Sequence, residues 1–252
     1  MASYPPGQCC AATGFKHEGT PTGEDIKIDA GKIAAYVAKP AADKNKAGAG
    51  IILIPDIFAI SNNSKLLADQ FAGAGYTTLI PDIFNGDEVF DWGKYDVMKY
   101  ITEGAHGNNP HTPEYVDAIV VAGIKALKED FAITKVGGVG YCFGGKYVVR
   151  HYKSGINVGY TAHPSFIEET ELAAITGPFA ISAAETDTIF PAEKRHQSEV
   201  ILKETGQPYQ INLFSGVEHG FATRGDMSIK HLRFAKEQAF QQAAAWFDYF
   251  LL

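Results

Sequence analysis

Three residues in the second half of the chain have the types and the order that a nucleophilic hydrolase needs. Cys142 stands between Gly140 and Gly144, so the sequence there reads G-x-C-x-G. A nucleophile on a sharp turn from a strand into a helix needs small residues two positions before and after it. Asp187 and His219 follow in the chain order nucleophile, acid, histidine, which is typical of such enzymes. The pattern predicts a Cys-His-Asp triad, with a buried structural thiol as the alternative for Cys142.

The expected chemistry depends on a thiolate and on two backbone amides. A free cysteine has a pKa of about 8.5, so it needs an imidazole and a positive helix end nearby to ionise at neutral pH. We expect His219 to be the base and Asp187 to orient it. Attack on a carbonyl group creates an oxyanion. Its expected donors are the amides of Phe143, directly after the nucleophile, and of Ile57, after an early apolar run.

Apolar runs that alternate with segments of helical spacing should position these residues. This alternation predicts an α/β fold in which a mostly parallel sheet of about eight strands has helices on both faces. Strands are expected at 26–29, 32–38, 51–54, 76–80, 134–141, 156–161, 178–183 and 209–214. The main helices are expected at 64–74, 113–127, 143–153, 191–204 and 228–250. Cys142, Asp187 and His219 each follow a strand, so they should meet at one edge of the sheet.

Five short motifs together resemble the dienelactone hydrolase (carboxymethylenebutenolidase) family. They are residues 56–58, 81–84, 140–145, 185–187 and 219–221. The resemblance covers roughly residues 24–252, and the Cys9-Cys10 arm with residues 14–19 is similar to the fungal branch of the family. It implies an α/β-hydrolase fold, a triad of Cys142, Asp187 and His219, and hydrolysis of a small ester or lactone.

The resemblance also implies roles for two charged positions near the triad. In bacterial members, a glutamate after the third strand helps to control ionisation of the nucleophile, and Asp56 stands in that place here, with a simple turn residue as the alternative. Those enzymes bind a substrate carboxylate with two arginines. This chain has no arginine at 85–87, and at the second place Thr223 stands at the matching step with Arg224 one residue later. The substrate is therefore left open, with Arg224 as a candidate anion contact.

Other residues are expected to line the site. His163 leaves a strand end on the same sheet edge as Cys142, and Phe58 and Trp92 are candidates for an apolar wall; an ordinary turn and ordinary packing are the alternatives. Residues 85–111 form a candidate lid, and residues 1–24 an irregular arm lying on the domain. No strong linker divides the chain, so we expect a single domain over residues 1–252.

The composition of the chain limits the kinds of molecule that we expect it to bind. The chain has 252 residues and a formal net charge of −7, which argues against a basic face for nucleic acid or anionic membranes. There is no signal-peptide core and no run of about 18 apolar residues. Three cysteines fit a reducing compartment, so we expect a cytoplasmic protein that acts on a small molecule. A homodimer is also left open.

The motifs allow two other interpretations, a dinucleotide-binding loop and a zinc site. The glycines at 138–144 partly match a dinucleotide fingerprint, but they lie mid-chain and the next strand ends without an acid. Cys9, Cys10 and His17 make a poor tetrahedral set for zinc. We therefore expect neither cofactor nor metal. The remaining alternative is a binding protein in which Cys142 is a redox-sensitive thiol.

Overall fold

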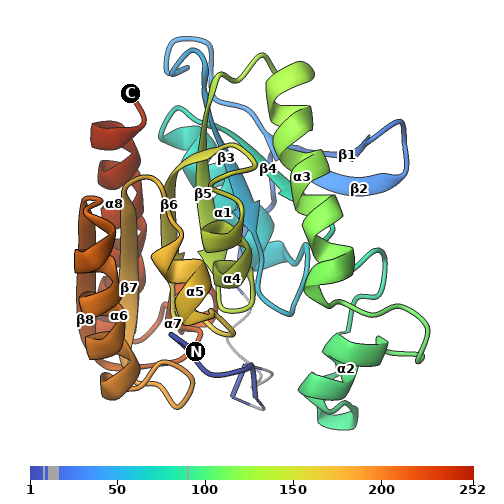
Figure 1. Ribbon diagram of the computed structural model, residues 1–252. Helices are drawn as coiled ribbons and strands as arrows, with labels where there is room; N and C mark the ends of the chain where they lie inside the picture. Colours follow the sequence, from blue (N-terminus) through green and yellow to red (C-terminus); the bar gives the residue numbers. More distant parts are fainter. Residues whose placement is uncertain (8, 11–16, 90) are drawn as a thin grey trace.

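Eight strands form one sheet, in the order β1-β2-β4-β3-β5-β6-β7-β8 (Figure 1). The computed structural model describes residues 1–7, 9–10, 17–89 and 91–252. The strands are β1 (Glu24–Ile28), β2 (Ile33–Ala38), β3 (Ala49–Ile54), β4 (Thr77–Pro81), β5 (Lys135–Tyr141), β6 (Ile156–Ala162), β7 (Phe179–Thr186) and β8 (Tyr209–Glu218). β1, β2 and β4 pair antiparallel, and every other pairing is parallel. The predicted mostly parallel sheet is confirmed.

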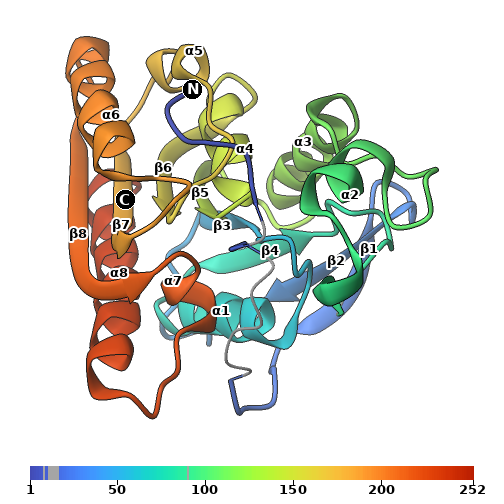
Figure 2. The ribbon, with the colours of Figure 1, turned by 90° about the horizontal axis from the view of Figure 1, so that it is seen from below.

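Helices cover both faces of the sheet. They are α1 (Asn62–Gly73), η1 (Trp92–Lys94), α2 (Val97–Glu103), α3 (Pro113–Glu129), α4 (Gly144–Arg150), α5 (Glu169–Ala173), α6 (Ala192–Thr205), α7 (Phe221–Arg224) and α8 (Lys230–Phe250). Figure 2 shows α1, α7 and α8 on one side and α3, α4, α5 and α6 on the other. Each layer buries its own apolar cluster against the sheet. All residues of β3 and β4 are buried, which explains why neither strand contains a charged residue.

The local sequence accounts for where the main helices begin. α3 starts at Pro113 after the cap Thr112, with Glu114 in its first turn, because proline fits the first helical position and an acid favours the positive end. α1 begins after Ser61, whose hydroxyl accepts a hydrogen bond from the Ser64 amide, a common N-cap arrangement.

Some element boundaries differ from the sequence-based expectation. β8 runs on to Glu218 instead of ending at 214, and it carries the chain to the loop of His219. α4 ends at Arg150 instead of 153, because residues 151–155 turn back toward β6 and Gly155 has φ 125°. The four-residue helix α7 was not expected, since one helical turn is too short to give a periodic pattern.

The segment 85–111, expected as a candidate lid, contains η1 and α2. Within its described part, Trp92, Tyr100 and Ile101 are buried. The Tyr100 hydroxyl donates to the Asp87 carbonyl oxygen at 2.6 Å, and the His111 ring lies 3.1 Å from the Asp87 carboxylate. These two contacts join residues within the segment. The rings of Tyr100 and His111 also pack on Phe84, with centroids 5.6 and 5.0 Å away, which connects the segment to the chain after β4. Its function as a lid stays a prediction.

The first residues of the N-terminal arm, 1–7, lie across the edge of the sheet where the parallel strands end (Figure 2). The Ala2 and Ser3 amides donate to the Ile167 carbonyl oxygen at 2.8 and 3.1 Å, and the Tyr4 amide donates to Ile189 at 2.9 Å. No helix or strand occurs before Glu24 in the described residues, and the irregular arm over residues 1–24 stays a prediction. Residues 14–16 of the fungal-type motif lie outside the described residues.

Among the residues with a described position, no helix combines the length and the apolar character that a membrane crossing needs.

Candidate active site

Cys142 occupies a strained turn between β5 and α4. Its φ is 50°, in the left-handed region that side-chain-bearing residues rarely adopt. A Cβ atom on Gly144 would lie 2.1 Å from the Ile54 carbonyl oxygen, and one on Gly140 would lie 2.6 Å from the Gly144 oxygen. Neither position can hold a side chain without moving backbone atoms. The G-x-C-x-G pattern is therefore a packing requirement of this elbow.

The ends of β5, β7 and β8 bring the three expected triad residues together. The Cys142 Sγ atom lies 3.1 Å from His219 Nε2, and His219 Nδ1 lies 2.9 Å from an Asp187 carboxylate oxygen. The other Asp187 oxygen accepts hydrogen bonds from the Ile189 and Phe190 amides at 2.8 and 3.0 Å. All three side chains are buried. They form one continuous hydrogen-bonded chain from a carboxylate to a thiol.

Electrostatic interactions favour the charged forms of Cys142 and His219. Burial raises the pKa of Cys142, but the hydrogen bond from Cys10 and the positive charge of His219 outweigh it, so the pKa lies well below its ordinary value. Burial lowers the pKa of His219, but the Cys142 charge and the bond to Asp187 raise it to about 10. The site therefore holds a thiolate beside an imidazolium, the form in which cysteine is a nucleophile.

The Ile57 and Phe143 amides lie at equivalent points in the loops that follow the neighbouring strands β3 and β5. Ile54 of β3 pairs with Gly140 of β5, and each amide belongs to the third residue after that pair. Close packing of Gly144 on the Ile54 carbonyl group draws the two loops together. Within the described part of the chain, neither amide donates to a protein acceptor. Both N–H groups are therefore available to a ligand.

Asp56 and Arg224 pair with each other. An Asp56 carboxylate oxygen contacts Arg224 Nη1 and accepts a hydrogen bond from the Thr223 hydroxyl at 3.0 Å. The Arg224 guanidinium also lies over the Phe58 ring, 4.7 Å from its centroid. Both charged side chains are at least nine-tenths buried. A substrate anion would thus have to compete with Asp56 for Arg224.

His163 lies beside the triad, at the end of β6. Its ring is 5.0 Å from the His219 ring, and it is completely buried. Burial lowers its pKa more than the neighbouring Cys142 raises it, so the ring is neutral. Neither ring nitrogen has a hydrogen-bond partner in the described part of the chain. This leaves an unused polar edge close to the nucleophile.

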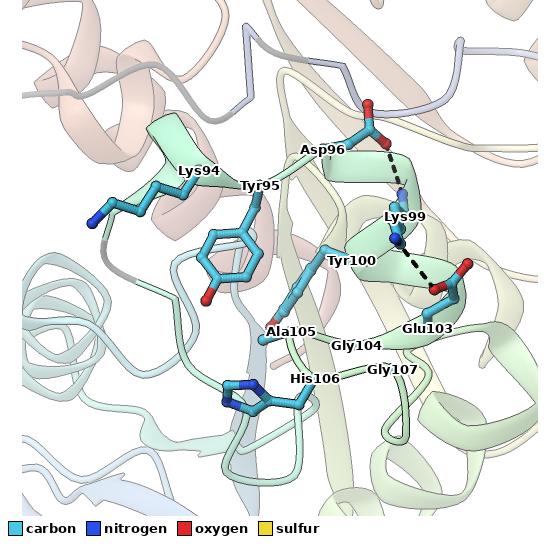
Figure 3. Close-up of a pocket in the computed structure, with 10 residues that line it drawn as sticks. All are labelled: Lys94, Tyr95, Asp96, Lys99, Tyr100, Glu103, Gly104, Ala105, His106 and Gly107. Atoms are coloured by element: carbon cyan, nitrogen blue, oxygen red, sulfur yellow. Dashed lines mark hydrogen bonds and ion pairs between the residues drawn. The ribbon is translucent and has the colours of Figure 1, made fainter.

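Phe58 and Trp92 form an aromatic contact between the loop of Asp56 and the candidate lid. Their ring centroids are 6.0 Å apart, and Trp92 also packs on Tyr100 at 5.0 Å. A separate surface pocket of about 390 Å³ lies within the 85–111 segment, between Tyr95 and His106 (Figure 3). Its lining includes none of the expected site residues. The aromatic contact, and not this pocket, links the segment to the site.

Cys10 is a site residue that the sequence did not point to. Its Sγ atom lies 3.5 Å from His219 Nε2, and the two thiols and this nitrogen all lie within 4.8 Å of one another. The sequence alone suggests Cys10 only as a poor zinc ligand, together with Cys9 and His17. In the structure, the Nε2 atom of His17 instead lies 2.9 Å from the Gly225 carbonyl oxygen. Cys10, Cys142 and His219 are ligand types that zinc accepts, and both thiols contact the same ring nitrogen of His219.

Two buried polar residues that the sequence gave no reason to select also support the site. The Ser165 hydroxyl is 3.7 Å from Cys142 Sγ, and its amide donates to the Cys142 carbonyl oxygen at 3.0 Å. Lys236 of α8 donates to the Ala222 carbonyl oxygen of α7 at 2.7 Å, and burial lowers its pKa to about 7. Neither belongs to a recognisable motif, so only the tertiary structure reveals them.

The sheet, its helices and the elbow define an α/β-hydrolase fold. A solved structure of a dienelactone hydrolase-like promiscuous phosphotriesterase from metagenomic libraries superposes with a TM-score of 0.71. The two chains are 16% identical, and the match covers 93% of this chain and 100% of the other. At this identity the likeness concerns the fold.

The family follows from the sequence comparisons. The dienelactone hydrolase family matches residues 33–251. Hydrolase tropI from Talaromyces stipitatus is 46% identical, over 100% of this chain and 99% of its own. Dienlactone hydrolase 1 from Gibberella moniliformis is 34% identical, over 98% and 95%. The chain belongs to the dienelactone hydrolase family and is a carboxylic ester hydrolase, which confirms the resemblance found in the sequence.

Proposed function

We propose that this hydrolase cleaves a small ester or lactone through a thiol acyl-enzyme intermediate on Cys142. The observation that carries the proposal is the continuous chain Asp187–His219–Cys142, with separations of 2.9 and 3.1 Å. A carboxylate, an imidazole and a thiol at hydrogen-bonding distance are the parts that covalent acyl transfer requires.

The reaction begins with attack of the Cys142 thiolate on the substrate carbonyl carbon. The carbonyl oxygen becomes an oxyanion, which the free Ile57 and Phe143 amides stabilise. His219, as imidazolium, gives its Nε2 proton to the departing alkoxide. In an ester this alkoxide leaves the site; in a lactone it stays attached to the acyl group. The product of this half is a thioester on Cys142.

Hydrolysis of the thioester completes the cycle. Neutral His219 removes a proton from a water molecule, which attacks the acyl carbon, and collapse of the second tetrahedral intermediate expels the Cys142 thiolate. Asp187 holds the Nδ1–H tautomer of His219, so Nε2 faces the reacting atoms. The two backbone amides on its other oxygen keep the carboxylate charged and fixed.

Substrate contacts follow from the residues around the nucleophile. Phe58 and Trp92 supply an apolar wall, and His163 adds a neutral ring beside the nucleophile. Asp56 helps to set the ionisation of the site through its pair with Arg224. Arg224 offers its charge to an anionic substrate group once that group competes with Asp56. A neutral ester leaves the ion pair intact, so both substrate types fit the proposal.

Replacement of the nucleophile tests this mechanism. Cys142→Ala should lower the hydrolysis of an activated ester such as p-nitrophenyl acetate by about 10³-fold or more, because no covalent intermediate can form. Cys9→Ala is the matched control, since it removes a thiol that lies outside the triad. Circular dichroism should verify that both variants fold. Full turnover by folded Cys142→Ala would contradict the proposal.

A further inference from the structure

We propose that Cys10 is a resolving cysteine for Cys142: a small peroxide oxidises Cys142, and Cys10 then joins it in a reversible disulfide that blocks the nucleophile. This second chemistry requires a reactive thiolate at Cys142 but no ester turnover. It can therefore fail or succeed independently of the proposed hydrolysis.

The thiols of Cys10 and Cys142 lie next to the same base, the imidazole of His219. Cys10 Sγ and Cys142 Sγ both contact His219 Nε2, at 3.5 and 3.1 Å, and the two sulfur atoms lie within 4.8 Å of each other. Both side chains are 0% exposed. Formation of a disulfide bond of about 2 Å requires these two sulfur atoms to move closer together. An oxidant must be small to reach a pair that is covered in this way.

The arm is fixed in this position by several contacts. Arg224 Nη2 donates to the Cys10 carbonyl oxygen at 3.2 Å, and the Cys10 amide donates to Gly7 at 2.9 Å. Nearer the N-terminus, the Tyr4 amide bonds to the Ile189 carbonyl oxygen, two residues after Asp187. Figure 2 shows the first residues crossing the sheet edge next to α5. Cys10 is therefore built into the site by the same loops that carry the triad.

The pKa values of Cys142 and Cys10 differ in the direction that an oxidised cysteine and its resolving partner require. The neighbouring Cys142 and Cys9 sulfur atoms, together with burial, raise the pKa of Cys10, so it remains a thiol. The pKa of Cys142 is lowered, as described above, so it is the thiolate. Susceptibility to oxidation follows thiolate character. Cys142 is thus attacked first, and the neighbouring thiol of Cys10 is in place for the second step.

The steps balance in atoms and electrons. The Cys142 thiolate attacks one oxygen of hydrogen peroxide, the O–O bond breaks, and the departing hydroxide takes the Nε2 proton of His219 to become water. Cys142 is now a sulfenic acid. His219 next accepts the Cys10 proton, the Cys10 sulfur attacks the Cys142 sulfur, and the S–O bond breaks. The hydroxide released takes that proton, so two thiols and one peroxide give a disulfide and two waters.

Cys9 is the other cysteine that could act as the resolving partner of Cys142. It is half-buried, and its thiol accepts a hydrogen bond from the Thr188 hydroxyl at 3.6 Å. The neighbouring Cys10 thiol lowers the pKa of Cys9 to about 6. However, Cys9 is outside the group formed by Cys10, Cys142 and His219. Cys9→Ser is therefore the matched control for Cys10→Ser.

The experiment treats wild type, Cys9→Ser and Cys10→Ser with hydrogen peroxide, blocks free thiols with iodoacetamide and maps tryptic peptides by mass spectrometry. Trypsin separates residues 1–16 from 136–146, so a bridge appears as a joined pair lighter by two hydrogen atoms. We expect this pair in wild type and in Cys9→Ser, its loss in Cys10→Ser, and its disappearance after dithiothreitol.

A trapping step keeps the result interpretable. Dimedone should label the Cys142 sulfenic acid strongly in folded Cys10→Ser, since no partner resolves it, and weakly in wild type. Ester hydrolysis by oxidised wild type should fall in proportion to the bridge and return after reduction. Three outcomes would overturn the inference: a bridge that persists in Cys10→Ser, a bridge that is lost in Cys9→Ser, or irreversible oxidation of Cys142 in wild type without any bridge.

Discussion

Cys142, His219 and Asp187 are far apart in the sequence, yet each could be selected because its neighbours carry a local signature. The elbow glycines mark Cys142, and strand ends followed by polar loops mark the other two. Cys10 has no such signature. Its place in the site depends on contacts of the arm with the Ile167, Ile189 and Arg224 regions, and tertiary contacts of this kind leave no periodic trace in the sequence.

The charged state of the triad leads to a prediction at the scale of single residues. The pKa of Cys142 is lowered, so the thiolate persists as the pH falls below the ordinary value of about 8.5. His219→Ala removes the positive charge and should move the midpoint of Cys142 alkylation to higher pH. At pH 7 the rate should drop by roughly tenfold or more, because an unassisted thiol is only a few per cent ionised.

Alkylation of Cys142 must be followed on its own peptide, 136–146, because Cys9 also has a lowered pKa of about 6. Iodoacetamide and mass spectrometry give the rate across the pH range. An identical profile in wild type and His219→Ala would mean that the imidazole does not activate the thiol.

At the scale of elements, the strand and helix assignments depend on patterns of different strength. β3, β4 and β5 were located to within a few residues, because each contains a run of buried, uncharged residues. The last part of β8 was missed, because Ser215, Gly216 and Glu218 are polar or small and exposed. α7 was missed because it is a single turn, although it carries Thr223 and Arg224.

The elbow between β5 and α4 gives a prediction for stability. Gly144→Ala should lower the free energy of unfolding by about 1–3 kcal/mol, because its Cβ would overlap the Ile54 carbonyl oxygen. Gly73→Ala is the matched control: nothing lies within 4 Å of its Cβ position at the end of α1, so it should be neutral or stabilising by up to about 1 kcal/mol. Urea denaturation of both variants measures the difference, and equal effects would argue against a sterically closed elbow.

At the scale of the whole molecule, the fold could be predicted because alternating strands and helices allow few arrangements. The packing of the arm and of the 85–111 segment on the sheet could not, since neither has a periodic pattern. The expectations of a cytoplasmic location and of a homodimer stay predictions.

The single domain expected for this chain predicts one cooperative unfolding transition. Circular dichroism and tryptophan fluorescence should report the same urea midpoint, because Trp92 lies in the 85–111 segment and Trp246 in α8. The Cys142→Ala variant provides a control without the reactive thiol. Two separate midpoints would instead indicate that the 85–111 segment or the C-terminal helix unfolds as an independent unit.

The central claim concerns a covalent intermediate on one sulfur atom, and intact-protein mass spectrometry tests it most directly. The enzyme is mixed with excess p-nitrophenyl acetate and quenched in acid within the first turnover. We predict a mass increase of one acetyl group, located on peptide 136–146, in wild type and its absence in Cys142→Ala. Rapid ester hydrolysis without any acyl group on Cys142, or with the acyl group on Cys9 or Cys10, would contradict the account.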